Sequence, residues 1–385
     1  MTIRIEGTVA PGFESVADAF AQSFEDRPGM GASLAIRLEG QTVARLWGGT
    51  ADARSGRPWT VDTPSVIFSC TKGLMSLAVA QLVEQGLVDY DAPVARYWPE
   101  FAAAGKADIS VREAMAHRAG LLAPRIDLTL DDIVDWDRMV AVLAGQEPLF
   151  EPDSGYAYHS LTHGWLTGEI VRRVTGLSPG AYFARNIAAP LGAEVWIGQP
   201  ERMEQVAHLK VIPPSPAPAD GPLPPNPDWP LRAATLGAAL PPTLVTETGG
   251  FNDPRLHRAE IPGAGGIATA EGLAAVWSAA VTETEGVRLV GPDVVERATR
   301  VVSEGPGIYP GPGPYYRWGM GFMLDADARR LLSHRSFGHD GAGGQVAFAD
   351  PEHKVGFAYL TNRMESPPDP RGNGVVTALR TILTR

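Results

Sequence analysis

Strand-forming patterns occupy both ends of this 385-residue chain, and helical patterns fill its middle. Residues 32–49 (ASLAIRLEGQTVARLWGG) form two apolar-rich runs around Glu39 and Gly40, which predicts a β-hairpin. From Tyr315 onward, three runs of alternating or apolar residues predict further strands: RWGMGFML, RSFGHDGAGGQVAFAD and KVGFAYLTN. Because strands must pair to be stable, we expect both ends of the chain to build one antiparallel sheet.

Helical periodicity dominates from Lys72 to about Leu191, so the middle of the chain predicts a mostly helical lobe. We expect residues 1–75 and 205–385 to form an α/β sheet lobe, and residues 76–204 the helical lobe. Two more helices are predicted in the sheet lobe, one ending before Pro28 and one over residues 372–385.

Residues 212–230 hold nine prolines, too many for a helix or a paired strand. A linker and a rigid surface loop are both consistent with this composition. A loop is favoured, because helical patterns resume directly after it. We expect part of residues 212–260 to lie over a groove of the molecule and to shape a pocket there, since long ordered loops are often functional.

Composition excludes several classes of function. The chain has 33 basic and 44 acidic residues, a net charge of −11, and no basic cluster, which disfavours a nucleic-acid partner. A single cysteine forbids an internal disulfide, and no Cys/His spacing resembles a zinc site. There is no signal-peptide pattern and no apolar run of the ~18 residues that a membrane span needs. We therefore expect a cytoplasmic protein without a membrane partner, and the sequence carries no signal for an oligomeric state.

The stretch FSCTKGLMSLAVAQLVEQG places Ser69 and Lys72 three residues apart at the start of a predicted helix. Both side chains then fall on one face, about one turn apart. A lysine whose pKa is lowered by burial can act as a base for the serine hydroxyl. The helix N-terminus supplies free backbone N–H groups that suit a developing oxyanion. Alternatively, Ser69 only caps the helix and Lys72 is a solvated surface side chain.

Cys70 is the other potential nucleophile of this stretch. It is rotated by about 100° from Ser69 and has no base at the same spacing. A buried thiol behaves as a small apolar side chain. Cys70 is therefore expected to be structural.

Two further stretches carry residues suited to the same chemistry. Tyr158 follows Pro152 by six residues, and its phenol could share the base role with Lys72. The small-residue run of residues 341–344 lies on or beside a predicted strand, where a substrate can approach the backbone closely. Taken alone, this stretch favours a packed tyrosine before a helix over a catalytic one.

Three ordered motifs together resemble a known family: Ser69-x-x-Lys72, Tyr158 with its upstream proline, and the segment His339-Asp340-Gly341. This order is found in serine β-lactamases and penicillin-binding proteins. The chain is most similar to the class C β-lactamase-like carboxylesterases, called family VIII esterases. The resemblance runs from about Gly31 to the end, and it implies a β-lactamase/penicillin-binding-protein-like fold, with an antiparallel sheet flanked by helices, a helical lobe and a groove between the lobes.

The resemblance also implies roles for individual residues. Ser69 would be the nucleophile, Lys72 the residue that deprotonates it, and Tyr158 a partner base and proton relay. The backbone N–H groups of Ser69 and Ala342 would form the oxyanion hole. The reaction would need neither a metal nor a cofactor.

Substrate binding would involve His339, Gly341 and Ser160, and here the chain departs from the β-lactamase pattern. The β-lactamase Tyr-x-Asn is replaced by Tyr158-His159-Ser160, which lacks the amide. The Lys-Thr-Gly motif is replaced by His339-Asp340-Gly341, and a histidine is mostly neutral near pH 7. Both changes favour a neutral ester, so we predict a serine carboxylesterase that acts on small esters through an acyl-enzyme. A β-lactamase, a D-Ala-type peptidase or amidase, and a non-catalytic binding protein on the same scaffold are the alternatives.

Other candidate sites have simpler interpretations. Residues 176–180 (GLSPG) match a G-x-S-x-G nucleophile elbow, but the preceding pattern is helical, and Ser178 is expected to cap a new helix. His339 and Asp340 are adjacent on a predicted strand and would point to opposite faces, which argues against a catalytic triad. For the remaining candidates, local hydrogen bonds rather than a metal are expected: His117, His159 and His163.

Overall fold

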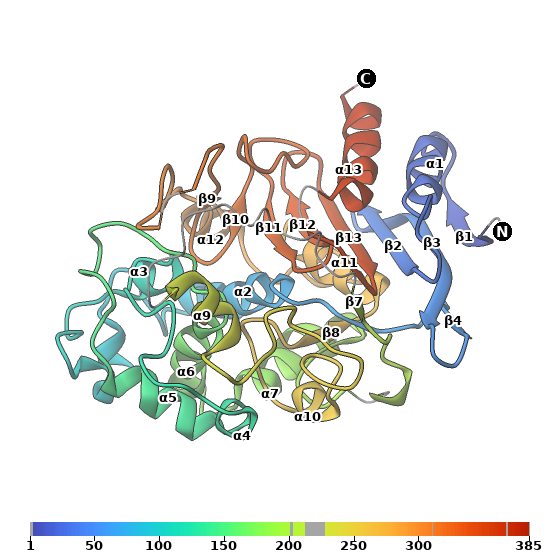
Figure 1. The fold of residues 1–385 in the computed structure, drawn as a ribbon. Coiled ribbons are helices and arrows are strands. Elements are labelled where there is room, and N and C mark those ends of the chain that lie inside the picture. Colours follow the sequence, from blue (N-terminus) through green and yellow to red (C-terminus); the bar gives the residue numbers. More distant parts are fainter. Residues whose placement is uncertain (1–2, 201–202, 212–227, 310, 367–368, 385) are drawn as a thin grey trace.

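The computed structural model describes residues 3–200, 203–211, 228–309, 311–366 and 369–384. Within these residues, one antiparallel sheet of nine strands runs through the molecule (Figure 1). Its strands are β1 (Ile5–Val9), β2 (Gly31–Leu38), β3 (Gln41–Asp52), β4 (Arg57–Pro58), β9 (Arg317–Trp318), β10 (Met323–Leu324), β11 (Phe337–Gly341), β12 (Gln345–Asp350) and β13 (Val355–Thr361). Their spatial order is β1-β3-β2-β13-β12-β11-β10-β9, with β4 paired to β3.

The centre of the sheet joins the two ends of the chain. N-terminal β2 pairs antiparallel with C-terminal β13 over seven residues, which confirms the predicted assembly of one sheet from both ends. The predicted hairpin turn has φ of +50° at Glu39 and +82° at Gly40. Two successive positive φ values give the turn that matches the right-handed twist of paired strands.

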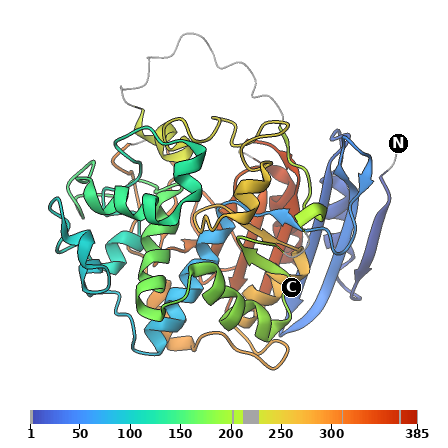
Figure 2. The same cartoon turned by 90° about the horizontal axis from the view of Figure 1, so that it is seen from below.

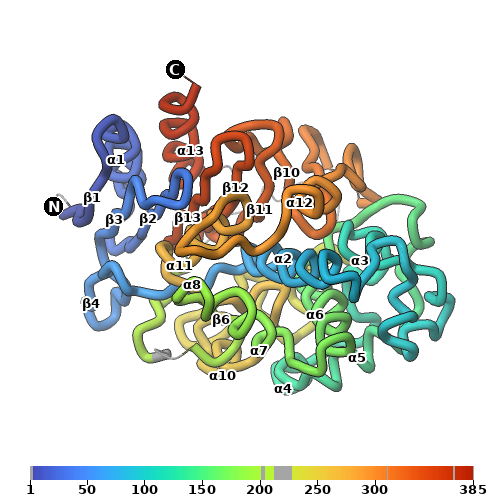
Figure 3. The backbone as a smooth tube through the Cα atoms, turned by 180° about the vertical axis from the view of Figure 1, so that it is seen from behind, coloured from blue at the N-terminus to red at the C-terminus, as the bar shows by residue number. Residues whose placement is uncertain are grey.

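Helices cover both faces of the sheet and fill the middle of the chain (Figures 1 and 3). They are α1 (Glu14–Gln22), α2 (Cys70–Glu84), α3 (Val111–Met115), α4 (Leu130–Val134), α5 (Trp136–Gly145), α6 (Thr162–Thr175), α7 (Pro179–Phe183), α8 (Ala189–Leu191), α9 (Trp229–Thr235), α10 (Pro254–Arg258), α11 (Ala270–Ala279), α12 (Pro292–Ala298) and α13 (Pro370–Leu383). Single turns of 3-10 helix occur at Val94–Arg96, Pro99–Ala102 and Met203–Gln205, and a π-helical turn at Ala184–Ala188.

Alternation along the strands separates two apolar layers. Leu34 and Ile36 of β2 face a cluster shared with α1 and α13. Ala35, between them, faces the larger cluster that contains α2, α6 and α11. Small residues on this second face let α11 pack closely, since a Cβ on Gly356 would lie 2.3 Å from the backbone nitrogen of Ser278.

The helical segments of residues 86–175 gather on the side away from the N-terminal strands (Figure 2). The central helix α2 joins this region to the sheet, because its buried side chains belong to one cluster with both. The division into lobes at residues 75 and 205 stays a prediction.

Some short elements differ from the sequence prediction. RWGMGFML is not one strand: β9 ends at Trp318, the chain turns through Gly321 at φ +76°, and Met323 of β10 pairs back with Trp318. A small sheet of β5 (Ser65–Val66), β8 (Gly266–Ala268) and β6 (Val195–Ile197) was not predicted, because such short strands leave no periodic pattern. The remaining short strands, β7 (Lys210–Val211) and β14 (Arg363–Met364), pair in parallel.

Of the proline-rich segment, residues 212–227 lie outside the described residues, and the chain resumes just before α9. The predicted position of this segment over the groove therefore stays a prediction. No helix among the described residues is both long enough and apolar enough to cross a membrane.

Candidate active site

A strained turn places Ser69 at the start of α2. Phe68, the preceding residue, has φ +46°, which is unusual for a bulky side chain. Its ring is buried edge-to-face against Phe251, with centroids 5.1 Å apart, and this packing holds the turn. Ser69 occupies the N-cap position, yet its side chain makes no capping hydrogen bond to the described residues. Strained positions that packing holds in place often mark functional sites, so Ser69 is the first candidate.

Three of the predicted site residues converge on one oxygen. Lys72 Nζ lies 3.0 Å from Ser69 Oγ, and Tyr158 donates a hydrogen bond to the same oxygen from Oη, also over 3.0 Å. Ser69 and Lys72 come from one helix face, whereas Tyr158 comes from the segment before α6. Two proton carriers thus contact one hydroxyl, which is the geometry that an activated nucleophile needs.

The surroundings of Lys72 favour its neutral amine. Its side chain is fully buried and lacks an ion pair with any carboxylate of the described residues. This burial lowers the pKa of Lys72 to about 7. The main-chain oxygens of Ser160 and Gly263 accept hydrogen bonds from Nζ over 2.6 and 2.7 Å. These two carbonyls can hold both N–H groups of a neutral amine, which leaves its lone pair facing Ser69.

Tyr158 is held by rings on several sides. Trp318 stacks on it at 5.2 Å between centroids and 25° between planes, and His117 meets it edge-on at 4.9 Å. Lys72 Nζ lies 4.9 Å from the centroid of the tyrosine ring. Burial raises the pKa of Tyr158 above its ordinary value, so the phenol keeps its proton at neutral pH.

Strand β11 and the turn after it lie beside the serine. A Cβ on Gly341 would come within 2.3 Å of the main-chain oxygen of Ile67, so glycine permits this close approach. Among the described residues, no acceptor is paired with the amide N–H of Ser69 or with that of Ala342. Both donors are therefore available to an oxygen of a substrate.

His339 is a neutral, buried residue. Its side chain is 2% exposed, and Nδ1 donates to the main-chain oxygen of Asp340 over 2.6 Å. Burial, with Lys72 nearby, lowers the pKa of His339 to about 3. The carboxylate of Asp340 pairs with Arg329 instead, at 2.5 and 3.1 Å. The structure therefore brings no His339–Asp340 dyad to Ser69.

A pocket of about 360 Å³ opens beside Tyr158. We call it the tyrosine pocket, because five tyrosines line it together with Ser160: Tyr156, Tyr158, Tyr309, Tyr315 and Tyr316. Its other lining residues include Pro230, the last proline of the proline-rich segment of residues 212–230. A larger hollow of about 780 Å³ lies around residues 104–113 and 147–153, without any of the predicted site residues.

The three histidines near Lys72 are buried and neutral. His159 Nε2 accepts from the Leu121 amide, His117 Nδ1 accepts from the His159 amide, and His163 Nε2 contacts the oxygen of Met115. Burial lowers the pKa of all three. Local hydrogen bonds thus satisfy one nitrogen of His117 and of His163, while the second nitrogen of each is unpaired among the described residues. The described residues form no group of three or more His, Cys, Asp or Glu that could hold a metal ion.

The other two candidate nucleophiles, Cys70 and Ser178, make structural hydrogen bonds. Cys70 is fully buried, its Sγ donates to the oxygen of His339 over 3.0 Å, and burial raises its pKa. Ser178 caps α7, as predicted, with Oγ accepting from the Ala181 amide and donating to Glu260 over 2.6 Å. The segment before Ser178 is helix α6 and a short turn rather than a strand, which excludes a nucleophile elbow.

Sequence reasoning missed Gly263, which supplies a hydrogen-bond acceptor to Lys72. A Cβ on Gly164 of α6 would lie 2.0 Å from the Gly263 nitrogen. Because Gly164 and Gly263 both lack a side chain, their backbones can lie in close contact. This contact places the Gly263 oxygen next to Lys72 Nζ. The glycine-rich stretch at residues 263–266 was the available signal.

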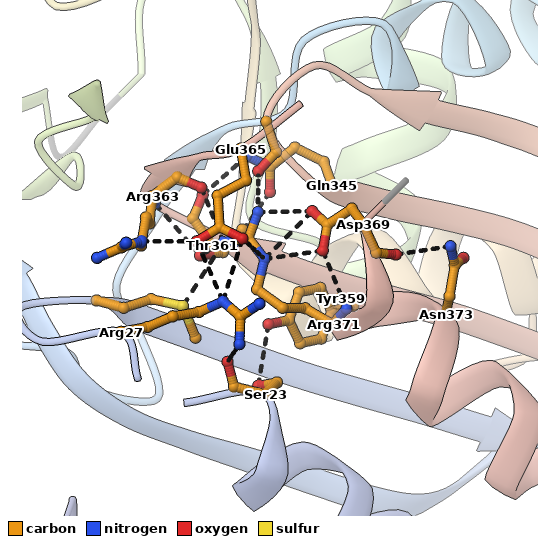
Figure 4. Close-up of polar contacts among 12 residues, drawn as sticks. Ser23, Arg27, Gln345, Tyr359, Thr361, Arg363, Glu365, Asp369, Arg371 and Asn373 are labelled. Carbon is orange, nitrogen blue, oxygen red and sulfur yellow. Dashed lines mark hydrogen bonds and ion pairs between the residues drawn. The ribbon is translucent and has the colours of Figure 1, made fainter. Parts of the chain in front are cut away.

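Arg371 was also missed. It is 1% exposed at the start of α13, and Nη2 donates both to Asp369 and to the main-chain oxygen of Gly343, over 2.6 and 2.7 Å. Figure 4 shows the surrounding network, in which Glu365 and Thr361 also face the guanidinium. Gly343 follows Ala342, so this buried arginine fixes the turn that carries the Ala342 amide.

Comparison with known proteins identifies the family of the chain. The family model described as Beta-lactamase matches residues 16–381. Esterase/beta-lactamase LipL of Mycobacterium tuberculosis is 33% identical over 389 residues, covering 94% of this chain and 84% of the relative. The crystal structure of a family VIII carboxylesterase superposes with a TM-score of 0.88 at 35% identity, covering 98% of this chain and 100% of the other. A penicillin-binding protein homologue from Caulobacter crescentus gives 0.87 at 34% identity, with the same coverage. The chain is a member of the Beta-lactamase family.

Proposed function

We propose that this protein is a serine carboxylesterase that hydrolyses small, uncharged carboxylic esters through an acyl-enzyme on Ser69. One observation carries the proposal: Ser69 Oγ lies 3.0 Å from both Lys72 Nζ and Tyr158 Oη. The family VIII carboxylesterase and Esterase/beta-lactamase LipL among the similar proteins support an esterase activity.

Acylation begins with neutral Lys72. Its lone pair takes the Ser69 proton as Oγ bonds to the ester carbonyl carbon. The negative charge that develops on the carbonyl oxygen is stabilised by the amide N–H groups of Ser69 and Ala342. Collapse of the tetrahedral intermediate breaks the bond to the alcohol oxygen. Tyr158 passes a proton to that oxygen and is reprotonated from Lys72, which frees the alcohol.

Deacylation repeats these steps with water. The water gives a proton through Tyr158 to Lys72, and its oxygen attacks the acyl carbon; Lys72 holds this proton for the serine. The bond to Ser69 Oγ then breaks, and the serine recovers its proton as the acid leaves. Lys72 is the principal base in this scheme, because its pKa is lowered to about 7, whereas the raised pKa of Tyr158 keeps the phenol protonated.

The preference for an uncharged ester rests on His339 and Ser160. Neutral, buried His339 offers no positive charge to a substrate carboxylate. The tyrosine pocket, which includes Ser160, has no charged side chain in its lining. Loss of one charge-assisted contact costs ~1.5–3 kcal/mol, or roughly ten- to a hundredfold in kcat/KM.

The test compares kcat/KM for p-nitrophenyl butyrate and for nitrocefin on one preparation. We expect efficient turnover of the ester and slow or absent turnover of the cephalosporin. Equal efficiency on both substrates would put a β-lactamase in first place. The cytoplasmic location stays a prediction from the sequence.

A further inference from the structure

The tyrosine pocket is uncharged and presents aromatic surface. Besides its five tyrosines and Ser160, its lining positions are leucine, alanine, glycine and proline. Its volume of about 360 Å³ is near the lower end for small-molecule sites. An apolar cavity of ~150 Å³ already accepts a benzene molecule, so one ring and a short linker fit in this pocket.

The tyrosine hydroxyls are mostly engaged within the protein. Tyr156 Oη donates to the oxygen of Gly305 over 2.5 Å, and Tyr315 Oη donates to the oxygen of Gly311 over 3.1 Å. Tyr158 Oη donates to Ser69. These bonds fix three of the five rings, so that those three offer ring carbons rather than free hydroxyls to a ligand. Aromatic side chains attract a second aromatic ring beyond the effect of buried area.

The position of Tyr158 assigns the pocket to one side of the ester bond. Its hydroxyl must lie near the leaving oxygen to return a proton to it. The carbonyl oxygen is directed toward the amides of Ser69 and Ala342, which are not in the pocket lining. Since Tyr158 forms one wall of the pocket, the alcohol part of the ester faces into it.

We propose that the tyrosine pocket binds the alcohol part of the ester and selects a flat, uncharged aromatic group, so that arylalkyl and aryl esters are the preferred substrate class. This inference rests on the proposed function and adds the identity of the leaving alcohol. It also predicts that an aromatic alcohol competes with water for the acyl-enzyme. In that transfer, the alcohol oxygen bonds to the acyl carbon as the bond to Ser69 Oγ breaks, and the alcohol proton returns to Ser69 through Tyr158 and Lys72.

The first measurement compares benzyl butyrate with cyclohexylmethyl butyrate, which differ in ring planarity and little in size. We expect kcat/KM to be roughly two- to tenfold higher for the benzyl ester. The second uses vinyl butyrate as the acyl donor, with equal concentrations of benzyl alcohol and cyclohexylmethanol. Because both alcohols meet the same acyl-enzyme, the ratio of the two product esters reports binding in the pocket, and we expect the benzyl ester to dominate by a similar factor.

Variants of the lining tyrosines test whether the preference for the benzyl group arises in the tyrosine pocket. Tyr309→Leu and Tyr316→Leu keep apolar bulk but remove a ring, and each should move both ratios toward one. Tyr97→Leu is the matched control, because Tyr97 contacts the Asp89 amide, is absent from the pocket lining, and should leave the ratios unchanged. Each ratio is measured within one preparation, so partial misfolding of a variant does not alter it.

The outcomes separate the two proposals. Ratios near one in the unmodified protein, or ratios that neither leucine variant changes, overturn the aromatic pocket and leave the esterase intact. If none of these esters is turned over, the proposed function fails, and this inference fails with it.

Discussion

Arg371 Nη2 donates a hydrogen bond to the main-chain oxygen of Gly343 over 2.7 Å, although the two residues are 28 positions apart. The same guanidinium is paired with Asp369, so its charge is compensated while it is buried. Gly343 lies in the turn between β11 and β12, directly after Ala342. A residue of the C-terminal helix thus positions the turn that carries the second proposed oxyanion donor.

Replacing Arg371 tests this positioning role. Arg371→Met leaves Asp369 without its buried partner, a change that typically costs ~3–5 kcal/mol of folding free energy, whereas Glu365 keeps its ion pairs with Arg27 and Arg363. We expect a lower Tm together with a fall in kcat of about tenfold or more and little change in KM. Arg371→Lys should recover part of kcat, because it restores a donor. Arg54→Met, which breaks an exposed pair with Asp52, should change neither quantity measurably. A folded Arg371→Met variant with normal kcat would show that the turn between β11 and β12 keeps its conformation without Arg371.

Substitution of the nucleophile should separate Ser69 from its rivals. Ser69→Ala removes the attacking oxygen and should lower kcat by ~10³-fold or more. Cys70→Ala and Ser178→Ala should stay within about tenfold, since both side chains are occupied with structural hydrogen bonds. Steady-state kinetics on p-nitrophenyl butyrate, with circular dichroism to verify folding, gives the comparison. A Cys70→Ala enzyme as inactive as the Ser69→Ala enzyme would reject the assignment.

Lys72 and Tyr158 contact the same oxygen and should behave as one proton-handling unit. Lys72→Ala and Tyr158→Phe should each reduce kcat severely, and the double variant should be little worse than either. A double-mutant cycle on kcat measures the coupling. If the fold-decrease in kcat of the double variant equals the product of the two single decreases, the two groups act independently.

Activity should depend on pH through Lys72. Below its pKa of about 7 the ammonium has no lone pair for the Ser69 proton, and above it the amine is neutral. We therefore expect kcat/KM to rise with pH and to level off, with an inflection near pH 7. His339, with its pKa lowered to about 3, titrates below this range. A profile that is flat between pH 5 and 9, roughly two units either side of the inflection, would argue against Lys72 as the base.

The sequence pattern predicted those turns, helix caps and helix faces that neighbouring residues determine. The turn at Glu39 and Gly40, the capping role of Ser178 and the shared helix face of Ser69 and Lys72 all follow from neighbouring residues. Helix α13 was predicted, but its first residue was not predicted correctly. It begins at Pro370 rather than at residue 372, with Asp369 as its N-cap, and this Asp-Pro pair is itself a start signal.

Contacts between distant segments could not be predicted in the same way. Gly263 reaches Lys72 across 191 positions, and only the close packing of Gly164 against Gly263 brings them together. Trp318 stacks on Tyr158 because β9 ends where the chain folds back into β10, within a run that looked like one strand. Periodicity specifies which face of an element is apolar, but it does not specify which remote backbone that face meets.

Covalent labelling identifies the nucleophilic side chain. The protein is treated with a fluorophosphonate probe, its intact mass is measured, and the modified peptide is sequenced by mass spectrometry. We predict one adduct per chain, on Ser69, which is suppressed when an ester substrate is present and absent from Ser69→Ala. An adduct on Ser178, or no adduct on a protein that turns over esters, would contradict it.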